Sequence, residues 1–211
     1  MDASAEASQR ALHRPDAPGR LRVRHPSQVA PEPWANRGGA TRALLAWPDP
    51  ARWALRVSVA EVERAGPFSV LPGVDRWFAV LAGDGVRLAT AGRASVVVRP
   101  GDGEMHAFPG DDATDCELLG GATRDLNVMV RRSEARATVR RLHDGGFSSD
   151  AALLACFVCD AASLAIGDGA ALALAPLTLA WVENPAREAL ALTLATPAPR
   201  GWWIEADTTA R

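Results

Sequence analysis

Apolar and polar residues alternate over several short stretches of the chain, which is the pattern of half-buried β-strands. In residues 53–59 the odd positions are Trp, Leu, Val and Val, while Arg56 and Ser58 share the opposite face. Residues 123–130 alternate in the same way. An uncharged run at residues 77–82 indicates a strand that is buried on both faces. These stretches predict a protein built mainly from strands.

Glycine and proline turns separate these strands at short intervals. They are densest between Gly66 and Gly85, where Gly-Pro and Pro-Gly precede the uncharged run and Gly-Asp-Gly follows it. Many short strands with such turns are typical of a β-sandwich or a barrel. Further predicted strands are residues 21–23, 43–47, 86–88, 94–99, 105–108, 116–119, 135–142 and 201–204.

The last third of the chain is rich in alanine and leucine, and propensity alone would make several of its runs helical. We assign strands instead, because residues 165–172 resemble residues 81–88 and both contain Gly-Asp-Gly between apolar residues. Two such hairpins predict a duplicated β unit. The three leucines of residues 190–194 also alternate at the strand period.

The composition is that of an ordinary globular protein: 211 residues, 48% of them apolar and 23% charged. All 23 basic residues are arginines, and the net charge of −2 gives no electrostatic reason to expect nucleic acid or a membrane as partner. No apolar run approaches the roughly 18 residues of a membrane span. Residues 1–20 lack the apolar region of a signal peptide and are expected to be a disordered tail. The three cysteines form no secreted framework, so a reducing cytoplasm fits best.

Metal and nucleophile chemistry find little support in the sequence. The four histidines are far apart, so the His-x-His pair of a barrel metal site is absent. Cys156 and Cys159 are interpreted as buried, inert thiols, because positions i and i+3 of a strand face opposite ways. No Gly-x-Ser-x-Gly elbow is present. We therefore expect no metal, no cofactor and no catalytic residue.

The remaining chemistry is a set of amide, hydroxyl and guanidinium groups near predicted strand ends, which suits recognition of a small anion. Two prolines and two adjacent glycines in residues 31–42 form a loop that allows close approach of the backbone. Its polar side chains are Asn36, Thr41 and Arg42. Asp75 and Arg76 stand together just before the uncharged run. A strand-end ion pair and a plain glycine loop remain alternatives that need no ligand.

Three sequence blocks resemble the HutD/Ves family, which is associated with bacterial histidine utilisation. The first, residues 33–42, reads P-W-A-N-R-G-G-A-T-R against a family pattern of P-W-x-N-G-G-G-x-T-R-E. The second runs from Trp53 to Gly85 and includes R-V-S, G-P-F-S and P-G-V-D-R. The third joins F-P-G-D, C-E-L and D-L-N-V-M between residues 108 and 129.

The resemblance implies a mainly β, cupin-like β-barrel with two barrel units in one chain, a bicupin. The units are expected at residues 21–132 and, in more divergent form, at 133–205, with the tail at 1–20 before them and a frayed end at 206–211. The resemblance implies no established enzymatic activity. Family members are thought to restrain histidine utilisation by sensing a pathway intermediate such as N-formylglutamate or urocanate.

The matched motif positions predict one pocket for a small carboxylate, held by arginines and Asn36 and walled by Phe68 and Phe108. The predicted ligand-binding residues are Asn36, Thr41, Arg42, Arg56, Ser58, Phe68, Asp75, Arg76, Phe108 and Asn127. Two departures lie in the ligand loop, where Arg37 replaces a glycine and Ala43 replaces an acidic or amide residue. We expect ligand identity or affinity to differ here, or the site to have decayed.

Two other interpretations stay open. A cupin-type isomerase or hydrolase acting on a small polar acid would use Asp75 or His106 as its proton carrier. A protein-interaction module or a homodimer would show a large apolar patch around Trp202 and Trp203. Nothing in the sequence resembles a helix-turn-helix, so direct DNA binding is not expected.

Overall fold

The computed structural model describes residues 19–143, 145–197 and 199–209, which form strands along most of their length. The prediction of a mainly β protein is confirmed, and a single 3₁₀ turn, η1 (Pro26–Gln28), interrupts the described strands. The strands are β1 (Arg22–Arg24), β2 (Glu32–Pro33), β3 (Gly39–Trp47), β4 (Leu55–Val62), β5 (Gly66–Pro67), β6 (Val74–Ala82), β7 (Val86–Thr90), β8 (Val96–Val98), β9 (His106–Pro109), β10 (Thr114–Leu118), β11 (Thr123–Arg131), β12 (Ala135–Arg141), β13 (Gly145–Ser149), β14 (Leu153–Val158), β15 (Ala162–Ile166), β16 (Leu172–Leu174), β17 (Thr178–Glu183), β18 (Leu190–Leu194) and β19 (Gly201–Thr208).

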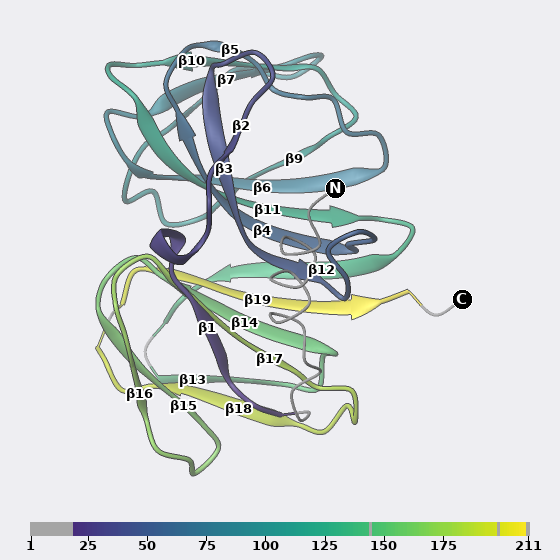
Figure 1. Cartoon of the computed structure of the whole chain (residues 1–211), viewed down its shortest axis with the longest axis vertical. Coiled ribbons are helices and arrows are strands. Elements are labelled where there is room, and N and C mark those ends of the chain that lie inside the picture. The colour runs from purple at the N-terminus through teal and green to yellow at the C-terminus, as the bar shows by residue number, and fades with distance from the viewer. Residues whose placement is uncertain (1–18, 144, 198, 210–211) are drawn as a thin grey trace, which may run out of the picture.

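The strands form four sheets in two halves, which lie one above the other in Figure 1. The first half has a six-stranded inner sheet, β2-β3-β4-β11-β6-β9, and a four-stranded outer sheet, β5-β10-β7-β8. The second half has a five-stranded inner sheet, β1-β17-β14-β19-β12, and a four-stranded outer sheet, β13-β18-β15-β16. The inner sheets face each other across the middle of the molecule.

Three apolar cores hold the sheets together. The largest lies between the two inner sheets and includes the fully buried Leu55 and Phe157. The second fills the interior of the second half around Trp203. The third surrounds Phe78 in the first half and contains fewer residues than the other two. The first half thereby keeps room for a cavity.

The two halves repeat one topology. The orders β4-β11-β6-β9 and β5-β10-β7-β8 of the first half become β12-β19-β14-β17 and β13-β18-β15-β16 when eight is added to each strand number. The predicted pair of Gly-Asp-Gly hairpins is nevertheless wrong. Residues 83–85 join β6 to β7, which belong to different sheets, whereas residues 167–169 join β15 to β16 within one sheet. The topological equivalent of the first turn is residues 159–161, between β14 and β15.

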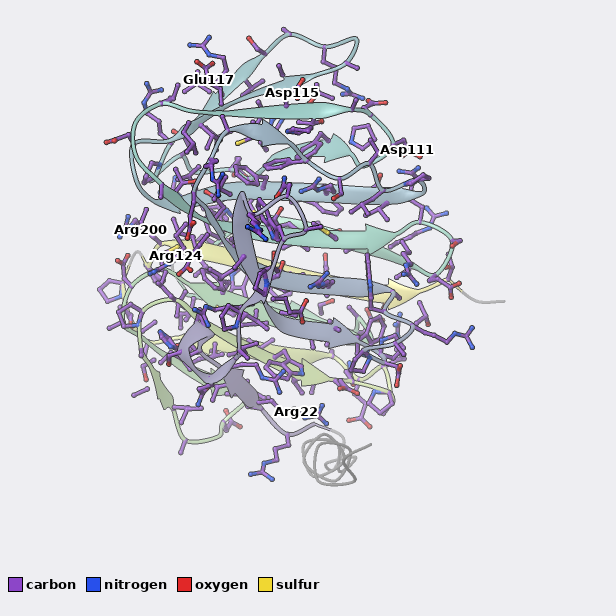
Figure 2. All side chains as sticks on the ribbon, turned by 45° about the horizontal axis from the view of Figure 1, so that its top comes forward. Arg22, Asp111, Asp115, Glu117, Arg124 and Arg200 are labelled. Atoms are coloured by element: carbon purple, nitrogen blue, oxygen red, sulfur yellow. The ribbon has the colours of Figure 1, made fainter. Side chains whose placement is uncertain are left out.

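Several predicted boundaries change. β1, which we placed in the first unit, pairs with β17 of the second half, and Figure 2 labels Arg22 at the lower end of that half. β19 continues to Thr208 through its pairing with β12, so residues 206–208 are not frayed. The predicted tail lies outside the described residues apart from residues 19 and 20. Within each half the described sheets pack through side chains and share no strand, so they do not form one continuous hydrogen-bonded barrel.

The tandem tryptophans do not form a surface patch. Trp202 is 5% exposed and packs in the core between the inner sheets, and Trp203 is 1% exposed inside the second half. The prediction of an apolar surface around them is wrong because β19 is a central strand with both faces covered. Among the described residues, no helix has the length and apolar character needed to cross a membrane.

Candidate anion-binding site

A cavity of about 470 Å³ opens in the first half, over the inner sheet. Two segments cover it, the one around β2 at residues 32–36 and the one between β5 and β6 at residues 67–71. Seven of the ten predicted ligand residues line it: Asn36, Thr41, Arg56, Ser58, Phe68, Arg76 and Asn127. A cavity of this volume suits a small organic ligand.

The register of the inner sheet brings two arginines into one row. Met129 of β11 pairs with Arg56 of β4 on one side and with Arg76 of β6 on the other. All three line the cavity. Because adjacent strands are about 4.8 Å apart, the two arginine Cα atoms are separated by about 10 Å. A ligand over Met129 therefore lies within reach of both guanidinium groups.

Arg76 is the most constrained polar residue of the site. Its side chain is buried, with 6% of the residue exposed. The guanidinium lies between the rings of Phe68 and Phe108, with its central carbon 4.9 Å from each ring centroid. Its Nη2 donates to Asn127 Oδ1 at 3.1 Å. Two aromatic faces and one amide thus fix the plane of the guanidinium before any ligand arrives.

The charge of Arg76 has no counter-ion among the described residues. None of the ion pairs within that part of the chain includes it, and its buried Nε has no hydrogen-bond partner there. Burial lowers the pKa of Arg76 to about 10, so the side chain remains charged at neutral pH. A buried cation without a carboxylate is costly. An anion that entered the cavity would relieve that cost.

The second arginine lies nearer the solvent and has a weaker partner. Arg56 Nη2 contacts Glu32 Oε2 at 3.4 Å, and the Glu32 side chain is 68% exposed. Such an exposed pair contributes at most about 1 kcal/mol. Among the described residues that line the cavity, Glu32 is the one carboxylate, and no histidine is present. The lining therefore favours binding of an anion over acid–base chemistry.

The loop that covers the cavity is fixed by its own hydrogen bonds. Asn36 Oδ1 accepts from Gly38 N at 2.9 Å, and Thr41 Oγ1 accepts from Trp34 Nε1 at 2.8 Å. Gly39 must be glycine, because a Cβ there would lie 2.1 Å from the Glu61 carbonyl oxygen. The close approach of backbone that the two glycines predicted thus brings β3 against β4.

Three predicted ligand residues lie outside the cavity lining. Arg42 Nη1 donates to the Val29 carbonyl at 2.7 Å. Asp75 is paired with Arg132 at 2.7 Å. Phe108 is 4% exposed and packs on the guanidinium of Arg76. The structure thus does not place these three side chains in the cavity lining, although Phe108 shapes the site through Arg76.

Comparisons with known proteins show which family the chain belongs to. The family model described as HutD matches residues 26–198. The chain belongs to the HutD family. It is 38% identical over 112 residues to an uncharacterised 21.2 kDa protein in the hutC 3′ region of Pseudomonas putida, and 32% identical over 108 residues to the protein Ves of Cronobacter sakazakii. Each alignment covers 51% of this chain, and it spans 57% and 59% of the respective relative.

Solved structures show the same fold over nearly the whole chain. A conserved protein of unknown function from Pseudomonas aeruginosa PAO1 superposes with a TM-score of 0.80 at 27% identity, covering 90% of this chain and 100% of that one. HutD from Pseudomonas fluorescens SBW25, in its formate condition, gives 0.79 at 22% identity with the same coverage. The protein Ylba from Escherichia coli gives 0.65 at 7% identity over 96% of this chain and 97% of that one. The cupin-like character of the HutD fold is thus confirmed.

Sequence reasoning missed several residues that line the cavity, among them Glu32, Trp34, Trp53 and Met129. Met129 shares a strand face with Asn127, so the alternation already indicated it. Trp34 belongs to the first HutD motif and its indole holds Thr41. Trp53 was assigned to the opposite face, but β4 begins at Leu55 and Trp53 precedes the regular strand.

The candidate proton carrier His106 also lies outside the cavity lining. Its ring stacks on Phe108 with centroids 5.5 Å apart. Burial, and then the nearby charge of Arg93, lower the pKa of His106. Among the described residues, no group of three or more histidine, cysteine, aspartate or glutamate side chains is placed to hold a metal ion.

The two departures from the HutD pattern do not remove a lining side chain. Ala43 pairs with Ser58 and does not line the cavity. Arg37 is exposed and has a φ of 55°, in the left-handed region that favours the glycine of the family pattern. The cavity therefore keeps its arginines and amides in spite of both changes.

Arg37→Gly is expected to raise the free energy of unfolding by about 0.5–1 kcal/mol, because a non-glycine residue in the left-handed region costs about 1–2 kcal/mol and glycine's own entropy offsets part of the gain. Urea unfolding measures the change. Ala35→Gly, in the same loop at an ordinary φ, is the control and is expected to destabilise. A lower stability of Arg37→Gly would contradict the conformational explanation.

Proposed function

We propose that this chain is a regulatory protein that binds a small carboxylate in the cavity of its first half and catalyses no reaction. The observation that carries the proposal is Arg76, a buried and charged guanidinium that lines the cavity and forms no ion pair with any described carboxylate, since Glu32 pairs with Arg56. Arg76 and Asn127 would hold the carboxylate at depth, and Arg56 would hold a second polar or acidic group of the ligand at the mouth. Membership of the HutD family supports a role in histidine utilisation, where the chain would sense a pathway intermediate such as N-formylglutamate or urocanate and restrain the pathway.

We further propose that the two halves are the two cupin-like units of a bicupin and that only the first one binds a ligand. Their strand orders agree, so the strands can be matched. Adding eight to the strand numbers makes β14 the counterpart of β6, which carries Arg76, and β19 the counterpart of β11, which carries Asn127. Leu154 of β14 and Trp203 of β19 both belong to the apolar core inside the second half. Leu154 is 0% exposed and Trp203 is 1% exposed, so apolar side chains fill the second interior. The chain would act in the cytoplasm, where such an intermediate arises.

A thermal-shift titration against histidine, urocanate, formiminoglutamate, N-formylglutamate, glutamate and formate tests the proposal. We expect a saturating shift with a carboxylate of this set, since a ligand at 100 times its dissociation constant adds about 2.7 kcal/mol of apparent stability. Arg76→Ala and Arg56→Ala are expected to remove or weaken that shift. Arg87→Ala, at an exposed pair with Glu117 on the outer sheet, should leave it unchanged. A flat response of the unaltered protein to all six compounds would count against the carboxylate site.

A further inference from the structure

One wall of the cavity is a segment whose residues are partly buried or exposed, and in which Phe68 packs against Phe78 of the third core. Residues 66–73, here called the strap, run from β5, which pairs with β10 of the outer sheet, to the start of β6. The side chains that line the cavity are Pro67, Phe68, Ser69 and Leu71. Phe68 supplies the ring that covers one face of the Arg76 guanidinium. Val70, at the centre of the strap, is 50% exposed. The position of the strap therefore decides whether Arg76 is sandwiched.

Main-chain hydrogen bonds fix the strap on either side of its exposed centre. Phe68 N donates to the Thr114 carbonyl at 2.8 Å, and Leu71 N donates to the Gly110 carbonyl at 2.6 Å. The second contact needs a glycine, because a Cβ on Gly110 would lie 2.8 Å from the Leu71 carbonyl oxygen. Both acceptors belong to the segment between β9 and β10 or to the start of β10. The position of the strap therefore depends on the position of the turn that carries Gly110.

An arginine outside the cavity ties that turn to the strap. Arg132 Nη1 donates to Asp75 Oδ1 at 2.7 Å and Nη2 donates to Asp111 Oδ2 at 2.5 Å. Asp111 Oδ1 accepts from Gly73 N at 2.9 Å, and the Gly73 carbonyl accepts from Arg132 N at 2.9 Å. The Gly73 amide and the Arg132 guanidinium hold the pKa of Asp111 below its usual range. Figure 2 labels Asp111 at the rim of the first half. We call these three side chains the clamp: Arg132, Asp75 and Asp111.

The clamp joins three chain segments without contacting the cavity. None of its side chains is part of the lining. Their exposed fractions are 40–44%, and pairs that exposed add little to global stability. The clamp is therefore expected to affect the local position and mobility of the strap more than the global stability of the protein.

We infer that Arg132, with Asp75 and Asp111, is a positioning residue of the anion site: the clamp holds the strap so that Phe68 stays on Arg76. The inference rests on the proposed function. It also explains why Asp75 stands beside Arg76 in the sequence, since β6 directs Arg76 inward to the ligand and Asp75 outward to the clamp. Loss of the clamp is expected to weaken binding by about five- to tenfold. Without the clamp the strap must become ordered when the ligand binds, and the entropy lost in that ordering reduces the net binding free energy.

Two readouts on the full chain test the inference with Arg132→Gln and the matched control Arg87→Gln, whose pair with Glu117 is similarly exposed. The first is hydrogen exchange of the strap amides without ligand. Faster exchange at Phe68 and Leu71 in Arg132→Gln, with an unchanged melting temperature, is expected. Equal exchange in Arg132→Gln and Arg87→Gln would overturn the clamp. Arg132→Lys keeps the positive charge but loses the two-pronged donor geometry of the guanidinium. Its strap amides are therefore expected to exchange at a rate between those of Arg132→Gln and Arg87→Gln.

The second readout is the dissociation constant for formate and for N-formylglutamate by calorimetry. We expect Asp111→Asn and Arg132→Gln to weaken binding about equally and their double variant to add little, because both break one network. Unchanged affinity in Arg132→Gln, alongside binding by the unaltered protein, would overturn the inference alone. If the unaltered protein bound neither anion, the proposed function would fall, and with it the positioning role.

Discussion

Replacing Arg76 with methionine is expected to weaken anion binding by about a hundredfold and, at the same time, to stabilise the empty protein. In the proposed function the guanidinium would donate a charge-assisted pair of hydrogen bonds to the carboxylate, and methionine would remove both. In the empty protein the same group is a buried cation held by one amide and two rings. Methionine fills the space between Phe68 and Phe108 without a charge, and such replacements stabilise by about 1–3 kcal/mol. Urea unfolding without ligand and calorimetry with N-formylglutamate measure the two effects.

Arg56→Met is the matched control for Arg76→Met, in which binding is expected to weaken while the stability of the empty protein rises. Arg56 shares the row with Arg76 but is partly exposed and paired with Glu32. We expect it to weaken binding by less than Arg76→Met and to change stability by no more than about 0.5 kcal/mol. A loss of stability in Arg76→Met would mean that its aromatic and amide contacts outweigh its desolvation, and the buried charge would then not be a feature kept for a ligand.

The fold was predictable as far as local patterns decide it. Alternation in residues 53–59 and 123–130 located β4 and β11, and strand periodicity at residues 190–194 correctly outweighed helix propensity. Pairing partners were not predictable, because they depend on contacts far apart in sequence. The Gly-Asp-Gly turn at residues 83–85 leads from one sheet to another, and nothing local distinguishes that path from a hairpin. β13 was missed because its first two residues, both glycine, indicate a turn.

The cavity lining was predictable in part, and one rule explains why two of the predicted residues lie outside it. Consecutive residues of a strand face opposite ways, so Thr41 and Arg76 reach the cavity while their neighbours Arg42 and Asp75 face elsewhere. The sandwich of Arg76 could not be foreseen, because Phe68 and Phe108 come from separate segments that meet only in the fold. Motif positions thus indicated which segments form the site, and the geometry decides which side chains of each segment face the ligand.

Asp125 is a second buried ionisable side chain of the first half. Unlike Arg76 it does not line the cavity, so its effect on stability can be measured apart from ligand binding. It shares a face of β11 with Asn127 but is 0% exposed and does not line the cavity. Thr123 Oγ1 donates to Oδ2 at 3.0 Å, while Oδ1 has no partner among the described residues. Burial raises the pKa of Asp125 to about 7, and the Thr123 hydrogen bond lowers it by less. The carboxyl group is thus protonated in the folded state under mildly acidic conditions that would ionise it in the unfolded chain.

Asp125→Asn is expected to stabilise the protein at pH 8 and to leave its stability unchanged near pH 4. The folded pKa of about 7 exceeds the unfolded value of about 3.9, so this group's full stabilising effect is present below the unfolded pKa and is lost as the pH rises through the folded pKa. Asparagine stays neutral at every pH and keeps the acceptor for Thr123. The gain at pH 8 has an upper limit of about 4 kcal/mol. Urea unfolding of both proteins at pH 4, 6 and 8 measures it, with Asp115→Asn on the exposed face of β10 as control (Figure 2). If the difference in unfolding free energy between Asp125→Asn and the unaltered protein were equal at all three pH values, packing and not the buried charge would set the effect. If the difference grows between pH 4 and pH 8, the fold tolerates an ionised, buried carboxylate in its first half at a measurable cost in stability.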